Sequence, residues 1–395
     1  MRVFFFNIEH YVNFEEESQN FLARLPLLNC GLEIVHRDHV HQRDLRSLGR
    51  AEAERSALDA VEEFKPDVVI YFQAWKDEDL SANTLGRIRA MGIPIIGFIW
   101  DSNLYPRWNE IQLFRNVDCL VIVDSLDAYL RWRMVARMFD EKKHVVFGAG
   151  LYHVPLTQKH YDRIYDAVLI GSIEGKRKDL IEHLTSAMAK RGIKFQHFGG
   201  LVDPTGTVGV SKDWLNWQEY DAVFRQSKLC ISSQTASTRL HIKGKIFEAM
   251  ARGTPNLVDH NSETARFFPP DVVAFYNNID DCVDKIAYYC EHPRERERLS
   301  HVATVWFEEN FDSRKFYSQL LTYIVTGQGV LPVLKHIEPL FERAWKERDM
   351  MLPIFSDAVT SLVKHLDKKG ALPPARSAVS VRPQWWWQRW NLFRR

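Results

Sequence analysis

Short runs of aliphatic and aromatic residues alternate along the chain with longer stretches in which apolar residues recur at helical spacing. This alternation is typical of a parallel β-sheet whose strands are connected by helices. In the first half it predicts strands at 2–8, 32–37, 67–73, 94–100, 118–124 and 144–147. Helical patterns lie between them, for example at 50–64 and 126–140, and Lys65-Pro66-Asp67 ends the first of these just before a strand. Residues 1–150 are therefore predicted to form one doubly wound α/β domain.

The same alternation begins again after a linker that contains Gly150, Pro155 and Tyr161. Strands are predicted at 165–170, 193–198, 228–233, 255–259 and 271–276, with consecutive helices at 278–326. The pattern indicates a second sheet domain at 151–328, followed by extra helices at 329–369. The expected fold is α/β, with two Rossmann-like domains that face each other across a cleft and with additional C-terminal helices.

Composition narrows the class of protein without identifying it. The chain has 395 residues, 46% hydrophobic and 26% charged, which is ordinary for a globular protein and long enough for two domains. Its 52 basic and 51 acidic side chains give a net charge of +1, so no broad positive field is present to hold nucleic acid. Five scattered cysteines favour reduced core thiols, and no run approaches the roughly 20 apolar residues of a membrane-spanning helix. We expect a cytoplasmic protein with no nucleic-acid partner.

The strongest chemical signal is the segment RLHIKGKIFEAMARGTPNLVD, in which a helix is predicted at 242–251. Three cations lie near the start of this helix: Arg239, Lys243 and Lys245. Cationic side chains and the free N–H groups of a helix N-terminus together favour a bound diphosphate. Glu248, one turn further along, is placed to accept hydrogen bonds from ribose hydroxyls and to stay charged beside the cations. From spacing alone, a solvated helix face explains these residues equally well.

At this segment the chain resembles a known family. The phrase KIFEAMARGTPNLVD, with YDAVLIGSIEGKRKDLIEHL upstream and YYCEHPRERERLSHVA downstream, is similar to the C-terminal domain of the CgeB-like spore-maturation glycosyltransferases, relatives of the retaining family 4 enzymes of the GT-B fold. The resemblance covers about residues 164–312, and in the first half it is confined to Ile99-Trp100-Asp101. It implies an enzyme that binds a nucleotide sugar mainly with its second domain and transfers the sugar with retention.

Position by position, the resemblance implies donor-binding roles. Gly171 and Ser172 are expected in the turn after the first strand of the second domain, where small residues let the backbone approach the donor phosphates. Arg177 matches a basic residue that can pair with phosphate in a bidentate manner. His197 and Gly199 belong to a loop where such enzymes bind the nucleotide base. The alternatives are an ordinary strand-to-helix turn for Gly171, surface charge for Arg177 and a structural histidine at position 197.

One departure from the wider family concerns the donor sugar. Family 4 enzymes have two glutamates eight positions apart; the second matches Glu248, a candidate catalytic residue, while the first falls on Leu240. His241 and Gln234 are the candidates by position for the missing sugar contact. The identity of the sugar therefore cannot be read from the sequence.

Polar residues follow two predicted strands of the first domain. Asn7, Glu9 and His10 come after the first strand, and Asp101 comes after the fourth. Ligands of an open parallel sheet bind beyond the carboxyl ends of its strands, so we expect this edge to face a glycan, lipid-linked or protein acceptor. Asp101 is the second candidate catalytic residue, as a base in an inverting reaction or as a positioning group in a retaining one. Its alternative role is to cap the helix that begins near Pro106 or to close an Asx turn.

Aspartate pairs at Asp124/Asp127 and Asp280/Asp281 invite comparison with metal-binding motifs. Both pairs fall where a predicted strand meets a helix, and aspartates routinely cap helices at such positions. The resemblance also implies that basic side chains and helix dipoles neutralise the leaving diphosphate. We therefore expect no catalytic metal and no cofactor.

The end of the chain has a different composition. Residues 370–383 are rich in Pro, Ala, Ser and Arg, which predicts a flexible linker. The tail at 384–395 contains four tryptophans, a leucine and a phenylalanine among three arginines. Tryptophan favours the headgroup region of a bilayer and arginine attracts anionic lipid, so we expect a peripheral contact with the inner membrane leaflet. Packing of the tail onto the protein itself or onto a partner chain is the alternative.

Two other functions remain open on the sequence alone. A sugar-nucleotide epimerase of the GT-B fold would share the donor site, although it needs acid and base groups on both faces of the sugar ring. A degenerate transferase domain that serves as a binding scaffold would explain Leu240.

Overall fold

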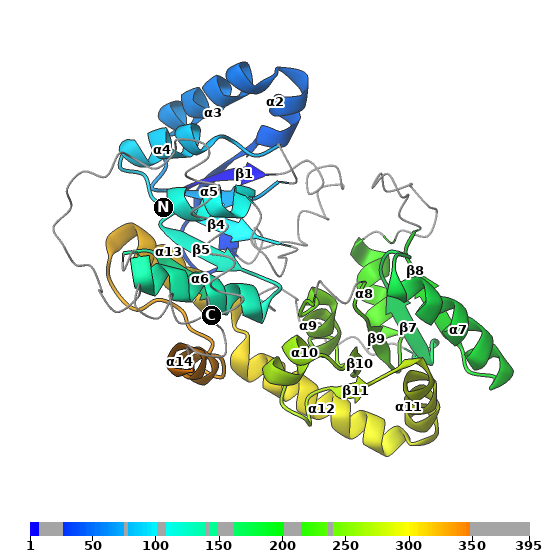
Figure 1. The fold of residues 1–395 in the computed structure, drawn as a ribbon. Coiled ribbons are helices and arrows are strands. Elements are labelled where there is room, and N and C mark those ends of the chain that lie inside the picture. Colours follow the sequence, from blue (N-terminus) through cyan, green and yellow to red (C-terminus); the bar gives the residue numbers. More distant parts are fainter. Residues whose placement is uncertain are drawn as a thin grey trace, which may run out of the picture. The chain divides into compact units, whose positions relative to one another are not determined.

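The computed structural model describes residues 1–7, 27–74, 78–100, 108–139, 142–148, 162–200, 215, 217–235 and 240–347. The first sheet in this part of the chain has six parallel strands in the order β2-β1-β3-β4-β5-β6 (Figure 1). The strands are β1 (Arg2–Asn7), β2 (Val35–Val40), β3 (Val68–Phe72), β4 (Ile95–Ile99), β5 (Cys119–Ile122) and β6 (His144–Phe147). The helices are α2 (His41–Ser47), α3 (Arg50–Phe64), α4 (Ala82–Ala90), α5 (Trp108–Asn116) and α6 (Leu126–Phe139).

Burial explains which strands of the first sheet have a clear sequence pattern. The strands β3, β4 and β5 are buried along their whole length, as expected for interior strands of a parallel sheet, and they read as continuous apolar runs. The edge strand β2 reads VHRDHV and is only partly buried. Its predicted position, 32–37, was wrong by three residues, because its register is set by backbone pairing of Arg2 with Val35 rather than by apolar side chains.

The second sheet has five parallel strands among the described residues, in the order β11-β10-β9-β7-β8. The strands are β7 (Ala167–Ile170), β8 (Phe195–Phe198), β9 (Cys230–Ser232), β10 (Asn256–Asp259) and β11 (Ala274–Tyr276). The helices are α7 (Lys176–Lys190), α8 (Trp217–Arg225), α9 (Gly244–Met250), α10 (Ser262–Phe267) and α11 (Ile279–Glu291).

Alternate side chains of β7 divide the core of the second sheet between its two faces. Ala167 and Leu169 pack with apolar residues of α7 and α11, whereas Val168 and Ile170 pack with those of α8 and α9 (Figure 1). Helices therefore cover both faces, as the strand and helix alternation predicts. The predicted fold class, α/β with two Rossmann-like parallel sheets and C-terminal helices, is confirmed.

The remaining helices are α12 (Pro293–Asn310), α13 (Ser313–Thr326) and α14 (Glu338–Lys346). Although α13 follows the second sheet in sequence, it packs on β3 of the first sheet, and its Tyr317 ring lies 6.5 Å from the ring of Phe98 in β4. The helix α14 packs on α6, where Glu338 forms an ion pair with Arg133. The rest of the extra helices predicted up to 369, and the tail, lie beyond the described residues. None of the helices within the described ranges is long and apolar enough to cross a membrane.

Candidate functional site

Two glycines shape the carboxyl edge of the second sheet. Gly171 follows β7 with a φ of +148°, and Gly199 follows β8 with a φ of +142°, values that residues with a side chain rarely adopt. A Cβ atom on Gly171 would lie 2.8 Å from Nη1 of Arg177 and 3.0 Å from Nζ of Lys245. A Cβ atom on Gly199 would collide with the carbonyl oxygen of Gly171. Glycine at these two positions therefore lets the backbone and both cations come together.

Arg177, in the first turn of α7, is only 6% exposed and donates hydrogen bonds to two loops. Its Nη1 donates to the carbonyl oxygen of Ser172 (2.9 Å) and to the Ser172 hydroxyl (3.3 Å). Its Nε and Nη2 donate to the hydroxyl and the carbonyl oxygen of Ser233, each at 3.1 Å. Because all three guanidinium nitrogens already bond to the protein, this arrangement does not favour the predicted bidentate pairing with phosphate. Arg177 instead joins the loops after β7 and β9 and contributes its charge beside Gly171.

The second cation beside Gly171 belongs to Lys245, which is partly buried. No hydrogen bond or ion pair joins its ammonium to any other residue that the structure describes. Burial, followed by the charge of Arg177, lowers the pKa of Lys245 to about 8, while Glu248 acts in the opposite direction. The neighbouring Lys243 has its Nζ 3.3 Å from Nδ1 of His241. Two cations lie beside one glycine, and none of the described acidic groups bonds to Lys245, so this part of the structure favours the binding of an anion.

The helix that holds Lys245 is shorter than predicted. The sequence predicts 242–251, but α9 spans only Gly244–Met250, because the Ile242 N–H bonds to the Asp124 carbonyl oxygen (2.7 Å) and Lys243 is extended. A helix of two turns has few aligned peptide dipoles. The positive potential near Gly171 therefore comes mainly from side chains.

Glu248 lies on the buried face of α9 and is 4% exposed. The Tyr220 hydroxyl, from α8, donates a hydrogen bond to its Oε2, and Nη1 of Arg252 donates to its backbone carbonyl oxygen (2.9 Å). Burial raises the pKa of Glu248, and Arg252, Tyr220 and Lys245 oppose this rise only in part. The sequence-based prediction that nearby cations keep this carboxyl group charged did not include burial, which has the largest effect on its pKa.

Two histidines near the site take part in contacts with the backbone, one through its ring and one through its own main chain. Nε2 of His197, in β8, lies 2.7 Å from the carbonyl oxygen of Gly171. His241 is buried, and Gln234 bonds to its backbone at both ends: the His241 N–H donates to Gln234 Oε1 (3.1 Å), and Gln234 Nε2 donates to the His241 carbonyl oxygen (2.7 Å). The Gln234 amide is therefore used within the protein. Contacts of these side chains with a base or a sugar remain predictions.

The structure therefore brings together most of the predicted donor-binding residues. They are Gly171, Ser172, Arg177, His197, Gly199, Lys243, Lys245 and Glu248. Arg239, Asp101 and His10 lie outside the described residues, so the roles predicted for them stay predictions. Within the described ranges, no three His, Cys, Asp or Glu side chains gather in a way that would hold a metal ion.

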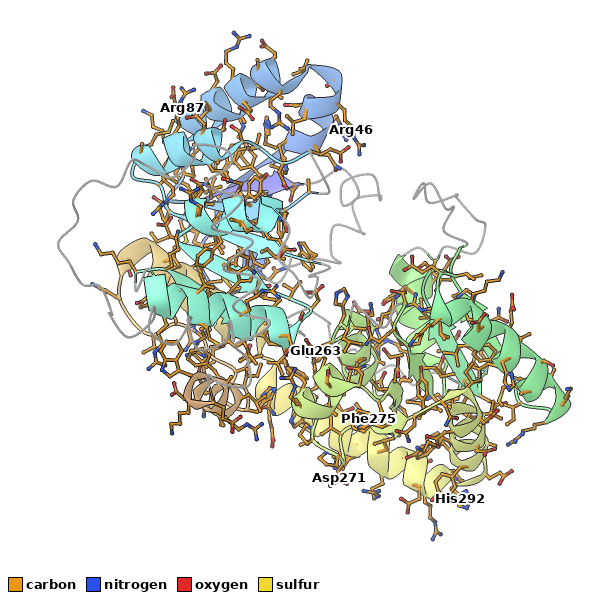
Figure 2. The ribbon with its side chains drawn as sticks, in the orientation of Figure 1. Arg46, Arg87, Glu263, Asp271, Phe275 and His292 are labelled. Atoms are coloured by element: carbon orange, nitrogen blue, oxygen red, sulfur yellow. The ribbon has the colours of Figure 1, made fainter. Side chains whose placement is uncertain are left out.

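Sequence reasoning also missed contacts of α8 and α10. Nothing in the sequence marks Tyr220 as the partner of Glu248, since the two residues lie on different helices. The caps that the structure shows come from residues other than the predicted aspartates. At the start of α6 the Ser125 hydroxyl accepts the Ala128 N–H (3.1 Å), and Glu263, from α10, accepts the N–H groups of Leu126 (2.7 Å) and Asp127 (2.9 Å) (Figure 2). Asn278 caps α11.

Comparisons with known proteins agree with this architecture. Residues 176–322 match a protein family described as glycosyl transferase-like, a range that includes Arg177, Lys245 and Glu248. No curated protein sequence matches the chain. The CgeB-like assignment is finer than this match and stays a prediction.

Solved structures show the same two-domain GT-B fold at low sequence identity. Sucrose-phosphate synthase from Thermosynechococcus elongatus has a TM-score of 0.57 at 11% identity, over 83% of this chain and 100% of that chain. Alr3699/HepE of Anabaena, in complex with UDP and glucose, has a TM-score of 0.56 at 11% identity, over 82% and 100%. A UDP-N-acetylglucosamine 2-epimerase has a TM-score of 0.51 at 11% identity, over 84% and 98%. At these identities the likeness concerns the fold alone.

Proposed function

We propose that the chain is a glycosyltransferase, which transfers a sugar from a nucleotide-sugar donor to a glycan, lipid-linked or protein acceptor. The observation that carries the proposal is the ammonium of Lys245, beside Arg177 and Gly171, without a hydrogen bond or an ion pair in the described part of the chain. A diphosphate carries the negative charge that would neutralise these two cations. The GT-B fold and the glycosyl transferase-like match at 176–322 support the same reaction class.

In such a transfer, the bond between the anomeric carbon and the β-phosphate oxygen breaks, and its electron pair leaves with the nucleoside diphosphate. A new bond forms to the acceptor hydroxyl oxygen, whose proton passes to the departing β-phosphate oxygen. Cations that are already in place when the negative charge develops on the leaving group lower the barrier. Lys245 and Arg177, together with Lys243 and Arg239, would supply this charge, and we therefore propose a metal-independent reaction.

The other residues of the site would orient the two substrates. Glu248 would accept hydrogen bonds from the ribose, while His197 and Gly199 would lie near the base. On the acceptor side, His10 and Asp101 keep the roles that the sequence predicts, with Asp101 as a positioning group in a retaining reaction of the CgeB-like type. Contact of the tail with the inner membrane leaflet would suit an acceptor of polysaccharide or lipid-linked character, because it concentrates the enzyme at its substrate.

A sugar-nucleotide epimerase is the second candidate, because an enzyme of that class has the same fold. Release of nucleoside diphosphate from UDP- and GDP-sugars, measured with and without candidate acceptors, separates the possibilities. A transferase releases diphosphate faster when an acceptor is present. An epimerase changes the sugar without acceptor-dependent release, and a binding scaffold does neither.

The site residues are tested by Glu248→Ala and Arg239→Ala, which should fold normally and lose nucleotide binding in calorimetry. Lys178→Met is a matched control, because Lys178 lies next to Arg177 on α7 with an exposed side chain whose ion-pair partner is Glu182. A variant that binds the nucleotide as tightly as the wild type removes its residue from the site.

A further inference from the structure

We propose that Tyr220 is a positioning residue of the nucleotide site: its hydroxyl fixes one oxygen of the Glu248 carboxyl group, so that the other oxygen faces the ribose. The inference rests on the proposed function, since it concerns how the ribose of the donor is recognised.

The two oxygens of the Glu248 carboxyl group have different surroundings. Oε2 accepts the hydrogen bond from the Tyr220 hydroxyl. Oε1 accepts no hydrogen bond from the described residues. It is also not one of the fully buried polar atoms that lack a partner. One oxygen is thus held by the protein, and the other remains available to a hydrogen-bond donor that enters from outside, such as a ribose hydroxyl.

One ion pair joins the helix of Tyr220 to the segment just after α9, and a second lies within α8 itself. Nε of Arg252 donates to Oδ1 of Asp221 (2.6 Å), and Nη1 of the same arginine donates to the Glu248 carbonyl oxygen (2.9 Å). Nε of Arg225 donates to the second oxygen of Asp221 (2.7 Å). Asp221 is the residue after Tyr220, so α8 and α9 are held together beside the tyrosine and the glutamate.

Packing keeps the tyrosine ring in place as well. Tyr220 is buried, and its ring lies edge-on to the ring of Phe224 with centroids 4.9 Å apart. Removal of its hydroxyl would leave the ring packed but take away the donor at Oε2. The buried carboxyl group could then rotate, and Lys245 is the cation one turn earlier on α9. Pairing with Lys245 would turn Oε1 away from the ribose.

The experiment compares nucleotides with and without ribose hydroxyls. Calorimetry measures binding of UDP and GDP, and of their 2′-deoxy and 3′-deoxy counterparts, to the wild type and to Tyr220→Phe. The wild type should prefer one ribonucleotide over a deoxy form by about tenfold, which is the effect of one well-placed hydrogen bond on affinity. Tyr220→Phe should lose this preference, while its affinity for the deoxy form stays at the wild-type value.

Tyr71→Phe is a matched control, because Tyr71 is also buried and donates its hydroxyl to a carboxylate, Asp79 (3.0 Å), in the first sheet domain. It loses this bond and the one that its hydroxyl accepts from the Leu80 N–H (2.9 Å), and it should keep the ribose preference. If Tyr220→Phe does not fold, Glu248→Gln tests the same geometry: Tyr220 would hold the amide oxygen and turn the NH₂ group toward the ribose. A neutral donor would then replace the carboxyl oxygen, which should weaken the preference.

The outcomes separate this inference from the function on which it rests. A wild type that binds neither nucleotide contradicts both. A wild type that prefers the ribonucleotide, with a Tyr220→Phe variant that keeps the full preference, overturns the role of Tyr220 and leaves the nucleotide site intact. A Glu248→Gln variant that retains the full preference of the wild type overturns this role in the same way.

Discussion

Replacement of Lys245 by methionine should stabilise the free protein and weaken its binding of nucleoside diphosphates. The ammonium is partly buried, lies beside Arg177 and makes no hydrogen bond or ion pair with the described residues. Methionine has a similar length and no charge, so Lys245→Met removes the unfavourable charge while it fills the same space. A residue that costs stability in the free protein and contributes to ligand binding is expected at a functional site.

The pKa of Lys245 gives the size of this effect. A decrease from 10.5 to about 8 corresponds to about 3 kcal/mol against the charged form if the group is fully desolvated, and its partial exposure reduces this to about 1–2 kcal/mol. Below pH 8 both the folded and the unfolded protein carry the proton, so the penalty is complete. Between pH 8 and 10.5 the unfolded chain holds more protons than the folded one, and wild-type stability rises with pH. The advantage of Lys245→Met should therefore be largest below pH 8 and fade toward pH 10.5.

Thermal unfolding at pH 7 and at pH 9.5, with and without UDP or GDP, tests this reasoning. At pH 7 the free variant should melt above the wild type, by about 2–4 °C for each kcal/mol in a domain of this size. The nucleotide should raise the Tm of the wild type more than that of the variant. Lys178→Met, the exposed control, should change neither value. A variant that is less stable than the wild type at pH 7, or that gains as much from the nucleotide, would refute the role of Lys245.

Three further predictions concern the backbone, the metal and the tail. Gly171→Ala should destabilise the fold by about 1–3 kcal/mol and weaken nucleotide binding, because its Cβ meets both cations. The control Gly192→Ala, at a position with a positive φ of +69° and open space, should strain the backbone but keep the nucleotide affinity of the wild type. Equal nucleotide affinities of the two variants would contradict this prediction. Transferase activity should survive EDTA, and a loss that magnesium or manganese reverses would disprove metal independence. The full chain should sediment with anionic liposomes more than a version that ends at Ala371, and equal recovery of both would argue against a membrane contact of the tail.

The strands could be predicted where burial on both faces requires a continuous run of apolar residues. Interior strands such as β4 are apolar at each position because helices cover parallel sheets on both faces. The edge strand β2 has no such apolar run, and backbone pairing with β1 sets its position. The end of α3 could be predicted because Pro66 follows Lys65, which adopts a left-handed conformation with a φ of +51°.

In the candidate site, residue types could be predicted better than their contacts. The positive charge at Lys245 and the need for glycine at position 171 follow from local sequence and from the resemblance. The contacts of Arg177 do not, because its partner Ser233 lies after a different strand and meets it only once the sheet has formed. The burial of Glu248 could not be predicted for a similar reason: it depends on α8, which packs over α9.

The contact between α6 and α10 joins residues that lie more than a hundred positions apart in the sequence. Glu263 accepts hydrogen bonds from the Ser125 hydroxyl (3.0 Å) and from two backbone N–H groups of α6. Donors at a helix N-terminus favour a charged carboxylate, yet burial, followed by the charge of Asp127, raises the pKa of Glu263 to about 8. Burial therefore outweighs the helix, and Arg266 compensates on the other side by pairing with Asp127 (2.6 Å). A helix cap that comes from a residue more than a hundred positions away, on the other sheet domain, can be found only in the folded chain.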